Sequence, residues 1–271
     1  MRWIKSLENP LIIEINKIKK KPEEKAFIEG LNLVKVAMEE HNKKDYWKVE
    51  KILLTDRFIS KNIDFFNFLK KGDYEIIGIE EKIEKKIADT VTPQGIFAVI
   101  SYKIRNLSEI TIDKPQLVVI LDKIQDPGNL GTIFRISEAF GVKTVILTTG
   151  SCNPLSPKVI RASAGSIFYI QILKAGIDEI ESFFKKYGLT LLITDPKAKK
   201  AIFEIDLSKK LAIVFGNEAH GISSYFKKLP HISCRIPHIG RTESLNVAIS
   251  ASIVLYEVFK TNIYITQKRL G

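Results

Sequence analysis

The second half of the chain contains short, almost uninterrupted apolar runs that alternate with helix-like segments. The clearest runs are 117–121 (LVVIL) and 211–215 (LAIVF), and further strands are expected over 143–147, 167–173, 189–193 and 232–236. Strands that are apolar on both faces need cover on both faces, which is typical of a mostly parallel sheet flanked by helices. The pattern therefore predicts an α/β fold, with helices over 129–140, 156–164 and 178–187.

The first half alternates in the same way, with shorter elements. Strands are expected over 48–54, 74–77 and 95–101, and 26–30 is either a short strand or a turn. Helices are expected over 11–19, 31–40, 64–70 and 80–86. Periodicity is lost in the polar stretch 102–115, which predicts a domain at 1–104, a linker at 105–115 and a second domain at 116–271.

The chain of 271 residues has a net charge of +11 and a pI near 9.4. Residues 116–271 carry 20 Lys and Arg against 12 Asp and Glu, so most of the positive excess lies there. This charge favours a polyanionic partner, with nucleic acid first, although a Lys-rich solvated surface is an equal alternative. No run is long enough to span a membrane, and two distant cysteines suit a reducing cytoplasm.

Three segments place polar residues just after predicted strands, where open parallel sheets bind ligands. The first is 121–135 (LDKIQDPGNLGTIFR), in which Asn129 is expected to open a helix that carries Arg135. The second is 213–221 (IVFGNEAHG), and the third is 236–259, a loop followed by a long helix. Taken alone, Arg135 fits an ordinary surface position. Together, the three loops predict one composite site.

Individual residues in these loops have structural as well as functional interpretations. Glu218 is either an acid of the ligand site or a structural cap. Ser244 or Thr242 is the expected N-cap of the last helix, whose unpaired N–H groups would attract an anion or a carbonyl. The small residues that follow allow close approach of a threaded loop or of a partner subunit.

Several other site types do not fit the sequence. The spacing of His220, His231, Cys234 and His238 matches no usual zinc pattern, so no metal is expected. The chain also lacks the GxGxxG and GK[ST] nucleotide fingerprints and the GxSxG nucleophile motif.

The three segments together resemble the SpoU (TrmH-like) family of RNA ribose 2′-O-methyltransferases, in the SPOUT superfamily. The matching motifs are DPGNLGTIFRISEAFG, VFGNEAHGIS and IPHIGRTESLNVAISASIVLYE, in the family's order and spacing across about 117–260. Residues 5–100 more weakly resemble the small substrate-binding domain of ribosomal-protein-like fold. The resemblance implies a mostly parallel sheet whose C-terminal part forms a trefoil knot, a homodimer, and a site that is completed across the dimer interface.

The resemblance also assigns roles to residues. S-adenosylmethionine would be held by Gly216, Asn217, Glu218, Ile236, Gly240, Leu245 and Asn246. The catalytic set would be Arg135, Asn129, Glu218, Ser244 and Asn246, with Arg135 acting on the 2′-hydroxyl and an RNA phosphate assisting. Phosphate contacts are expected from Lys158, Arg161 and Arg241, for which a solvated surface is the alternative.

The expected substrate is 23S ribosomal RNA, because minimal tRNA enzymes of this family lack the N-terminal domain. The alternatives are a tRNA methyltransferase and a non-catalytic RNA-binding protein. A nucleotide-binding oxidoreductase is disfavoured by the missing dinucleotide fingerprint.

Overall fold

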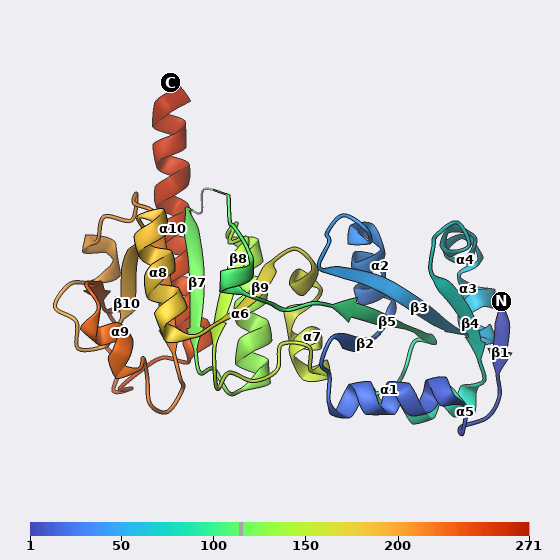
Figure 1. Ribbon diagram of the computed structural model, residues 1–271. Coiled ribbons are helices and arrows are strands. Elements are labelled where there is room, and N and C mark those ends of the chain that lie inside the picture. Colours follow the sequence, from blue (N-terminus) through green and yellow to red (C-terminus); the bar gives the residue numbers. More distant parts are fainter. Residues whose placement is uncertain (114–115, 271) are drawn as a thin grey trace. The chain divides into compact units, whose positions relative to one another are not determined.

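The computed structural model describes residues 1–113 and 116–270, with side chains up to Asn262. The chain forms two compact units (Figure 1), of which unit 1 comprises residues 1–103 and 153–168 and unit 2 the remainder. The predicted linker, 105–115, includes residues 114 and 115, which lie outside the described residues. Its earlier part forms strand β6 (Arg105–Asn106) and the short 3-10 helix η1 (Leu107–Glu109) in unit 2. The predicted domain limits stay predictions.

Unit 1 is built on a five-stranded sheet in the order β1-β4-β3-β5-β2. Its strands are β1 (Arg2–Ile4), β2 (Lys25–Glu29), β3 (Trp47–Thr55), β4 (Glu75–Ile79) and β5 (Ile96–Tyr102). β1, β4 and β3 are parallel, whereas β5 runs antiparallel to β3 and β2. The three predicted strands are confirmed, and 26–30, for which a strand or a turn was expected, forms β2. β1 was missed because three residues are too few to show a period.

Helices cover this sheet through apolar residues three or four apart. They are α1 (Pro10–Lys20), α2 (Leu31–Glu40), α3 (Asp56–Lys61), α4 (Ile63–Leu69), α5 (Glu81–Ile87), α7 (Pro157–Ser163) and the 3-10 helix η2 (Ser166–Phe168). Asn9 caps α1 by accepting from the backbone N–H of Leu11, and Ile12 and Ile15 enter the core beside Ile83 of α5. α7 packs against β2, far from it in sequence.

Unit 2 contains a seven-stranded sheet in the order β12-β10-β11-β7-β8-β9-β6, in which every described pairing is parallel. The strands after β6 are β7 (Leu117–Asp122), β8 (Thr144–Thr148), β9 (Gln171–Ala175), β10 (Thr190–Thr194), β11 (Leu211–Gly216) and β12 (Ile232–Cys234). The prediction of a mostly parallel α/β sheet is confirmed.

One predicted strand, 167–173, is wrong in its first half. The chain turns at Ala164 and Gly165, both with positive φ, and η2 follows before β9 begins at Gln171. Phe168 is fully buried against Trp47 of unit 1, with 4.6 Å between ring centroids. The apolar run 167–173 therefore contributes its first residues to the core of unit 1 and its last residues to the core of unit 2. Residue types alone do not show where the run is divided.

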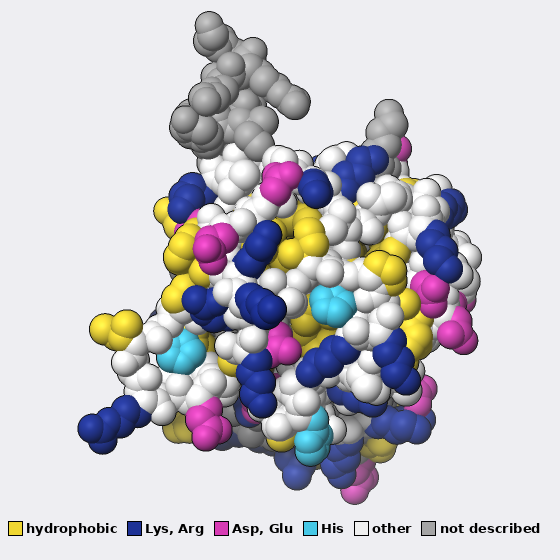
Figure 2. Space-filling model, turned by 90° about the vertical axis from the view of Figure 1, so that its left-hand side faces the viewer, with side chains coloured by type: hydrophobic (Ala, Val, Ile, Leu, Met, Phe, Trp, Pro, Cys, Tyr) yellow, Lys and Arg dark blue, Asp and Glu magenta, His cyan; other side chains and the backbone are white. Residues whose placement is uncertain are grey.

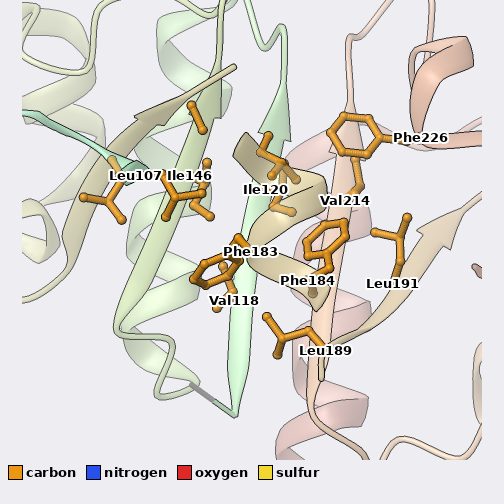
Figure 3. Packing of buried hydrophobic residues seen from close by; sticks show 14 of the residues in the cluster. Leu107, Val118, Ile120, Ile146, Phe183, Phe184, Leu189, Leu191, Val214 and Phe226 are labelled. Carbon is orange, nitrogen blue, oxygen red and sulfur yellow. The ribbon is translucent and has the colours of Figure 1, made fainter. Parts of the chain in front are cut away.

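Helices lie on both faces of the unit 2 sheet, with α8 (Ile177–Tyr187) on one face and α6 (Pro127–Ala139) and α10 (Val247–Leu270) on the other (Figure 1). The shorter elements are α9 (Ser224–Lys228) and η3 (Ile202–Glu204). Phe183 and Phe184 of α8 pack over Val118 of β7 and Val214 of β11 (Figure 3). Over the described residues, no helix has both the length and the apolar character needed to cross a bilayer.

Candidate active site

A cavity of about 470 Å³ lies in unit 2 beyond the carboxyl ends of β10, β11 and β12 and beside the start of α10. Parallel strands end at the same edge of a sheet, so residues distant in sequence meet there. The lining residues are Thr194, Asp195, Pro196, Gly216, Asn217, Glu218, Ala219, His220, Gly221, Ile222, Cys234, Ile236, His238, Ser244, Leu245, Asn246, Val247 and Ser250.

The last residue of β11, Gly216, must be glycine because the backbone folds back against it. A Cβ atom there would lie 2.3 Å from the carbonyl carbon of Gly221 and 2.3 Å from the nitrogen of Ile222. The backbones of Asn217 and Gly221 exchange two hydrogen bonds of 3.0 and 2.8 Å, which close this turn. The turn therefore presents bare backbone to the cavity, where a ligand can approach it closely.

Asn217 fastens the turn to the end of the neighbouring strand. Its Nδ2 donates to the carbonyl oxygen of Lys123 at 2.8 Å, and its Oδ1 accepts from the backbone N–H groups of Ala219 and His220 at 2.9 and 3.0 Å. The side chain is buried, so its polar atoms need these partners. Asn217 thus fixes the relative positions of the first and second motifs.

Glu218 gathers donors from the first motif. Its Oε1 accepts from the backbone N–H of Asp126 at 3.2 Å and from Nδ2 of Asn129 at 3.0 Å, and its Oε2 accepts from the N–H of Gln125 at 3.3 Å. Burial acts to raise the pKa of Glu218, but the hydrogen bonds from Asn129 and the backbone outweigh it and hold the pKa below its ordinary value. The ionised carboxylate is therefore the form that joins the loops.

Asn246 connects the third motif to the first. Its Nδ2 donates to Oδ1 of Asn129 at 3.0 Å, while its own Oδ1 accepts from the N–H groups of Ala248 and Ile249 at 2.8 and 3.3 Å. Asn129, Glu218 and Asn246 thus form one hydrogen-bonded chain, called here the motif junction. It joins residues that are 89 and 117 positions apart in the sequence.

These contacts correct two predictions about helix starts. α10 begins at Val247 with Asn246 as its N-cap, so the expected cap at Ser244 or Thr242 is wrong. The Thr242 hydroxyl instead donates to the carbonyl of Ser244 within the loop. α6 begins at Pro127, where Asp126 accepts from the N–H of Asn129 at 2.8 Å, so Asn129 does not open the helix. The Asn129 side chain is thereby left for the motif junction.

Replacing Asn246 with alanine is expected to lower the free energy of unfolding by about 1–2 kcal/mol, because α10 loses its N-cap. Asn246→Asp is the matched control, since aspartate caps a helix about as well but cannot donate to Asn129. Urea unfolding of both variants measures the two roles of Asn246 separately: Asn246→Asp loses only the hydrogen bond to Asn129, whereas Asn246→Ala loses the helix cap as well. Equal stability of the alanine variant and the wild type would contradict the capping role.

Six of the seven predicted cofactor residues line the cavity, and Gly240 does not. Of the predicted catalytic residues, Glu218, Ser244 and Asn246 line the cavity. Asn129 and Arg135 do not, and Arg135 is exposed on α6. Arg135 lies six positions after Asn129 on α6, which is about 9 Å of rise and roughly 240° of turn. The two side chains therefore leave the helix on different faces. The catalytic and cofactor roles of these residues stay predictions.

The predicted RNA contacts fall in both units. Lys158 and Arg161 lie on α7 in unit 1, where Nη1 of Arg161 is 2.9 Å from Oδ2 of Asp89. Arg241 lies exposed in the loop before α10 in unit 2. The charge of Arg161 is therefore partly offset by Asp89, a partner 72 residues away that local sequence pattern does not indicate.

Sequence reasoning missed several lining residues. Thr194, Asp195 and Pro196 follow β10 directly, and the same strand-exit argument used for the other loops identifies them. His238 also lines the cavity, and its ring nitrogens lie 3.1 and 2.9 Å from the carbonyl oxygens of Ile236 and Thr242. Burial raises the pKa of the Cys234 thiol to about 12, so this lining cysteine is not a thiolate nucleophile.

Residues 116–256 match the SpoU rRNA methylase family, and residues 9–98 match the MRM3-like substrate binding domain. The chain belongs to the SpoU rRNA methylase family. It is 31% identical over 269 residues to an uncharacterized tRNA/rRNA methyltransferase of Synechocystis sp., covering 94% of this chain and 92% of that protein. It is 29% identical over 180 residues to the 23S rRNA guanosine 2′-O-methyltransferase RlmP of Bacillus subtilis, covering 66% and 71%.

A crystal structure of an AdoMet-bound rRNA methyltransferase from Sinorhizobium meliloti superposes with a TM-score of 0.81 at 27% identity, covering 95% of this chain and 97% of that one. The similar structures are knotted SPOUT methyltransferases, so the predicted knotted α/β fold is confirmed. The predicted enzyme class, an S-adenosylmethionine-dependent RNA 2′-O-methyltransferase, is also confirmed by family membership.

The cavity suits that cofactor. Its volume of about 470 Å³ falls within the roughly 300–1,000 Å³ of small-molecule sites. The glycine turn at Gly216 exposes backbone, Ile236 and Leu245 add apolar surface, and Asn217, Glu218 and Asn246 are already held in place by hydrogen bonds. Within 1–113 and 116–270, no group of three or more His, Cys, Asp or Glu residues is arranged to hold a metal.

Proposed function

We propose that this enzyme methylates a ribose 2′-hydroxyl in 23S ribosomal RNA. The observation that carries the proposal is the motif junction of Asn129, Glu218 and Asn246, which joins all three SpoU motifs beside one cavity. The relative from Bacillus subtilis is named as a 23S rRNA 2′-O-methyltransferase, and the N-terminal match to a substrate binding domain favours a large RNA over tRNA. Cys152 and Cys234 are not joined in a disulfide, which fits a cytoplasmic setting.

The chemistry needs a ribose oxygen in line with the methyl group that S-adenosylmethionine supplies when bound. Positioning of this kind accounts for a large part of many enzymatic rate accelerations. The guanidinium of Arg135 contacts and polarises the 2′-hydroxyl, and because arginine does not give up its own proton, an RNA phosphate accepts the hydroxyl proton. Glu218, Asn129 and Asn246 act as positioning residues, and Ser244 orients the phosphate.

A homodimer completes the site in this proposal. Arg135 lies outside the cavity lining of its own chain, so a second copy brings the arginine to the ribose. Support comes from α10, where Ile249 and Tyr256 are 53% and 50% exposed although both are apolar. They are seven residues apart and therefore share one helix face, which is the kind of surface that a partner subunit covers.

Tritium transfer from S-[methyl-³H]adenosylmethionine to purified 23S ribosomal RNA, 16S ribosomal RNA and bulk tRNA tests the proposal. We expect label in 23S RNA alone, followed by a single 2′-O-methyl site on mapping. Label in tRNA alone would establish the tRNA alternative and overturn the substrate. Cofactor binding by calorimetry without transfer to any RNA would favour the non-catalytic alternative.

A further inference from the structure

A basic loop lies beside the cavity in unit 2. Residues 195–200 (DPKAKK) connect β10 to the segment before η3, and Asp195 and Pro196 line the cavity. Lys197, Lys199 and Lys200 are all exposed. We call 195–200 the lysine loop.

The backbone of the lysine loop is fixed from within by Arg235. Nη1 of Arg235 donates to the carbonyl oxygens of Ala198, at 3.1 Å, and of Lys199. The backbone N–H of Arg235 donates to the carbonyl oxygen of Lys200 at 2.9 Å. Because these carbonyl groups are held toward Arg235, the three lysines have a defined backbone from which to extend into solvent.

A second set of contacts anchors the start of the loop to the cavity wall. The N–H of Asp195 donates to the carbonyl of Cys234 at 2.9 Å, and the Asp195 carboxylate accepts from the N–H of Lys197 at 2.9 Å. Cys234 and Asp195 both line the cavity. The position of the lysines is therefore tied to the site by short, direct hydrogen bonds.

The loop concentrates positive charge without neutralising it. Over the part of the chain that the structure describes, none of the three ammonium groups has an ion pair or hydrogen bond, and Arg235 adds a fourth positive charge. Figure 2 looks at the end of unit 2, and Lys and Arg side chains are more numerous there than acidic ones. Like charges held close together repel, and a polyanion relieves that repulsion.

We propose that the lysine loop binds phosphates of the substrate RNA next to the methylation cavity. This inference rests on the proposed function, since it names how that substrate is held. The ammonium groups contact phosphates and not base edges, so the loop fixes the position of the RNA strand at the cavity without reading its sequence. Its contribution falls with added salt, because each contact releases a counterion.

The test is the triple variant Lys197→Ala, Lys199→Ala, Lys200→Ala in the full chain. The matched control is Lys143→Ala, Lys209→Ala, Lys210→Ala, which removes the same charge from exposed lysines that precede β8 and β11, at the opposite edge of the same sheet. Filter binding to a 23S ribosomal RNA transcript is measured from 50 to 300 mM KCl. Calorimetry with S-adenosylmethionine and thermal unfolding report on the site and the fold.

We expect the lysine-loop variant to bind RNA at least about tenfold more weakly at low salt, with a salt slope shallower by about 2, while the control changes neither. Restoring the charge with Lys197→Arg, Lys199→Arg, Lys200→Arg is expected to restore the slope. Equal slopes for the loop variant and the control would overturn the proposal. Failure of the wild-type enzyme to methylate any RNA would overturn the proposed function instead. Methyl transfer and the salt dependence of RNA binding are separate measurements, so the two failures can be told apart.

Discussion

Gly216→Ala is expected to lower the free energy of unfolding by about 3 kcal/mol, the upper end of the usual cost of overpacking, and to abolish binding of S-adenosylmethionine. The added Cβ would lie 2.3 Å from two backbone atoms, the carbonyl carbon of Gly221 and the nitrogen of Ile222. Backbone cannot move aside as a flexible side chain does. Relief of the clash therefore requires breaking the two hydrogen bonds between Asn217 and Gly221, which shape the cavity wall.

Urea unfolding followed by circular dichroism, together with calorimetric titration of the cofactor, measures both effects. Gly240→Ala is the matched stability control. Gly240 lies in the loop before α10, and a Cβ added there has no atom within 4 Å. A change of under about 0.5 kcal/mol is expected for this control. If Gly216→Ala were as stable as Gly240→Ala, the close approach at Gly216 would be incorrect.

Arg135→Ala is expected to reduce methyl transfer to RNA by about 10²–10³-fold, the usual effect of removing a group that polarises a reacting oxygen. Cofactor affinity and thermal stability should not change. The reason is that Arg135 is exposed, lies outside the cavity lining and, within the described residues, makes no hydrogen bond or ion pair. Loss of the side chain thus removes chemistry without disturbing the fold.

Single-turnover tritium transfer at saturating cofactor measures this effect, with calorimetry as the binding readout. Lys143→Ala serves as the control, because it removes one exposed positive charge from the opposite edge of the sheet. Transfer by Arg135→Ala at the wild-type rate would show that another group acts on the 2′-hydroxyl. A parallel loss of cofactor binding would instead assign Arg135 to the cofactor site.

The sheet of unit 2 was largely predictable from sequence because its strands are apolar on both faces. Runs such as 117–121 and 211–215 are apolar on both faces, so they are expected in a sheet that helices cover on both sides. They form β7 and β11. Helix interiors followed from apolar spacing in the same way, as in α2 and α8. Prediction failed where one apolar run was divided between two cores, at Ile167 and Phe168.

The cavity lining was predictable only in part. Motif resemblance identified Gly216, Asn217, Glu218, Ile236, Leu245 and Asn246, all of which line it. The helix caps were wrong because Ser, Thr, Asp and Asn near a helix start are chemically similar as caps, and the loop's path selects among them. At α10 that path places Asn246, and not Ser244, within reach of the backbone of Ala248.

By itself the sequence determined the fold class, the family and the three motif loops, since these depend on residue type and on spacing along the chain. Only the tertiary structure decided which side chains of those loops bind one another. The contacts of Glu218 and Asn246 with Asn129 span 89 and 117 residues, and they exist because β11 lies beside β7 and α10 packs against α6. The order of strands in a sheet is a property of long-range packing, which local sequence pattern does not encode.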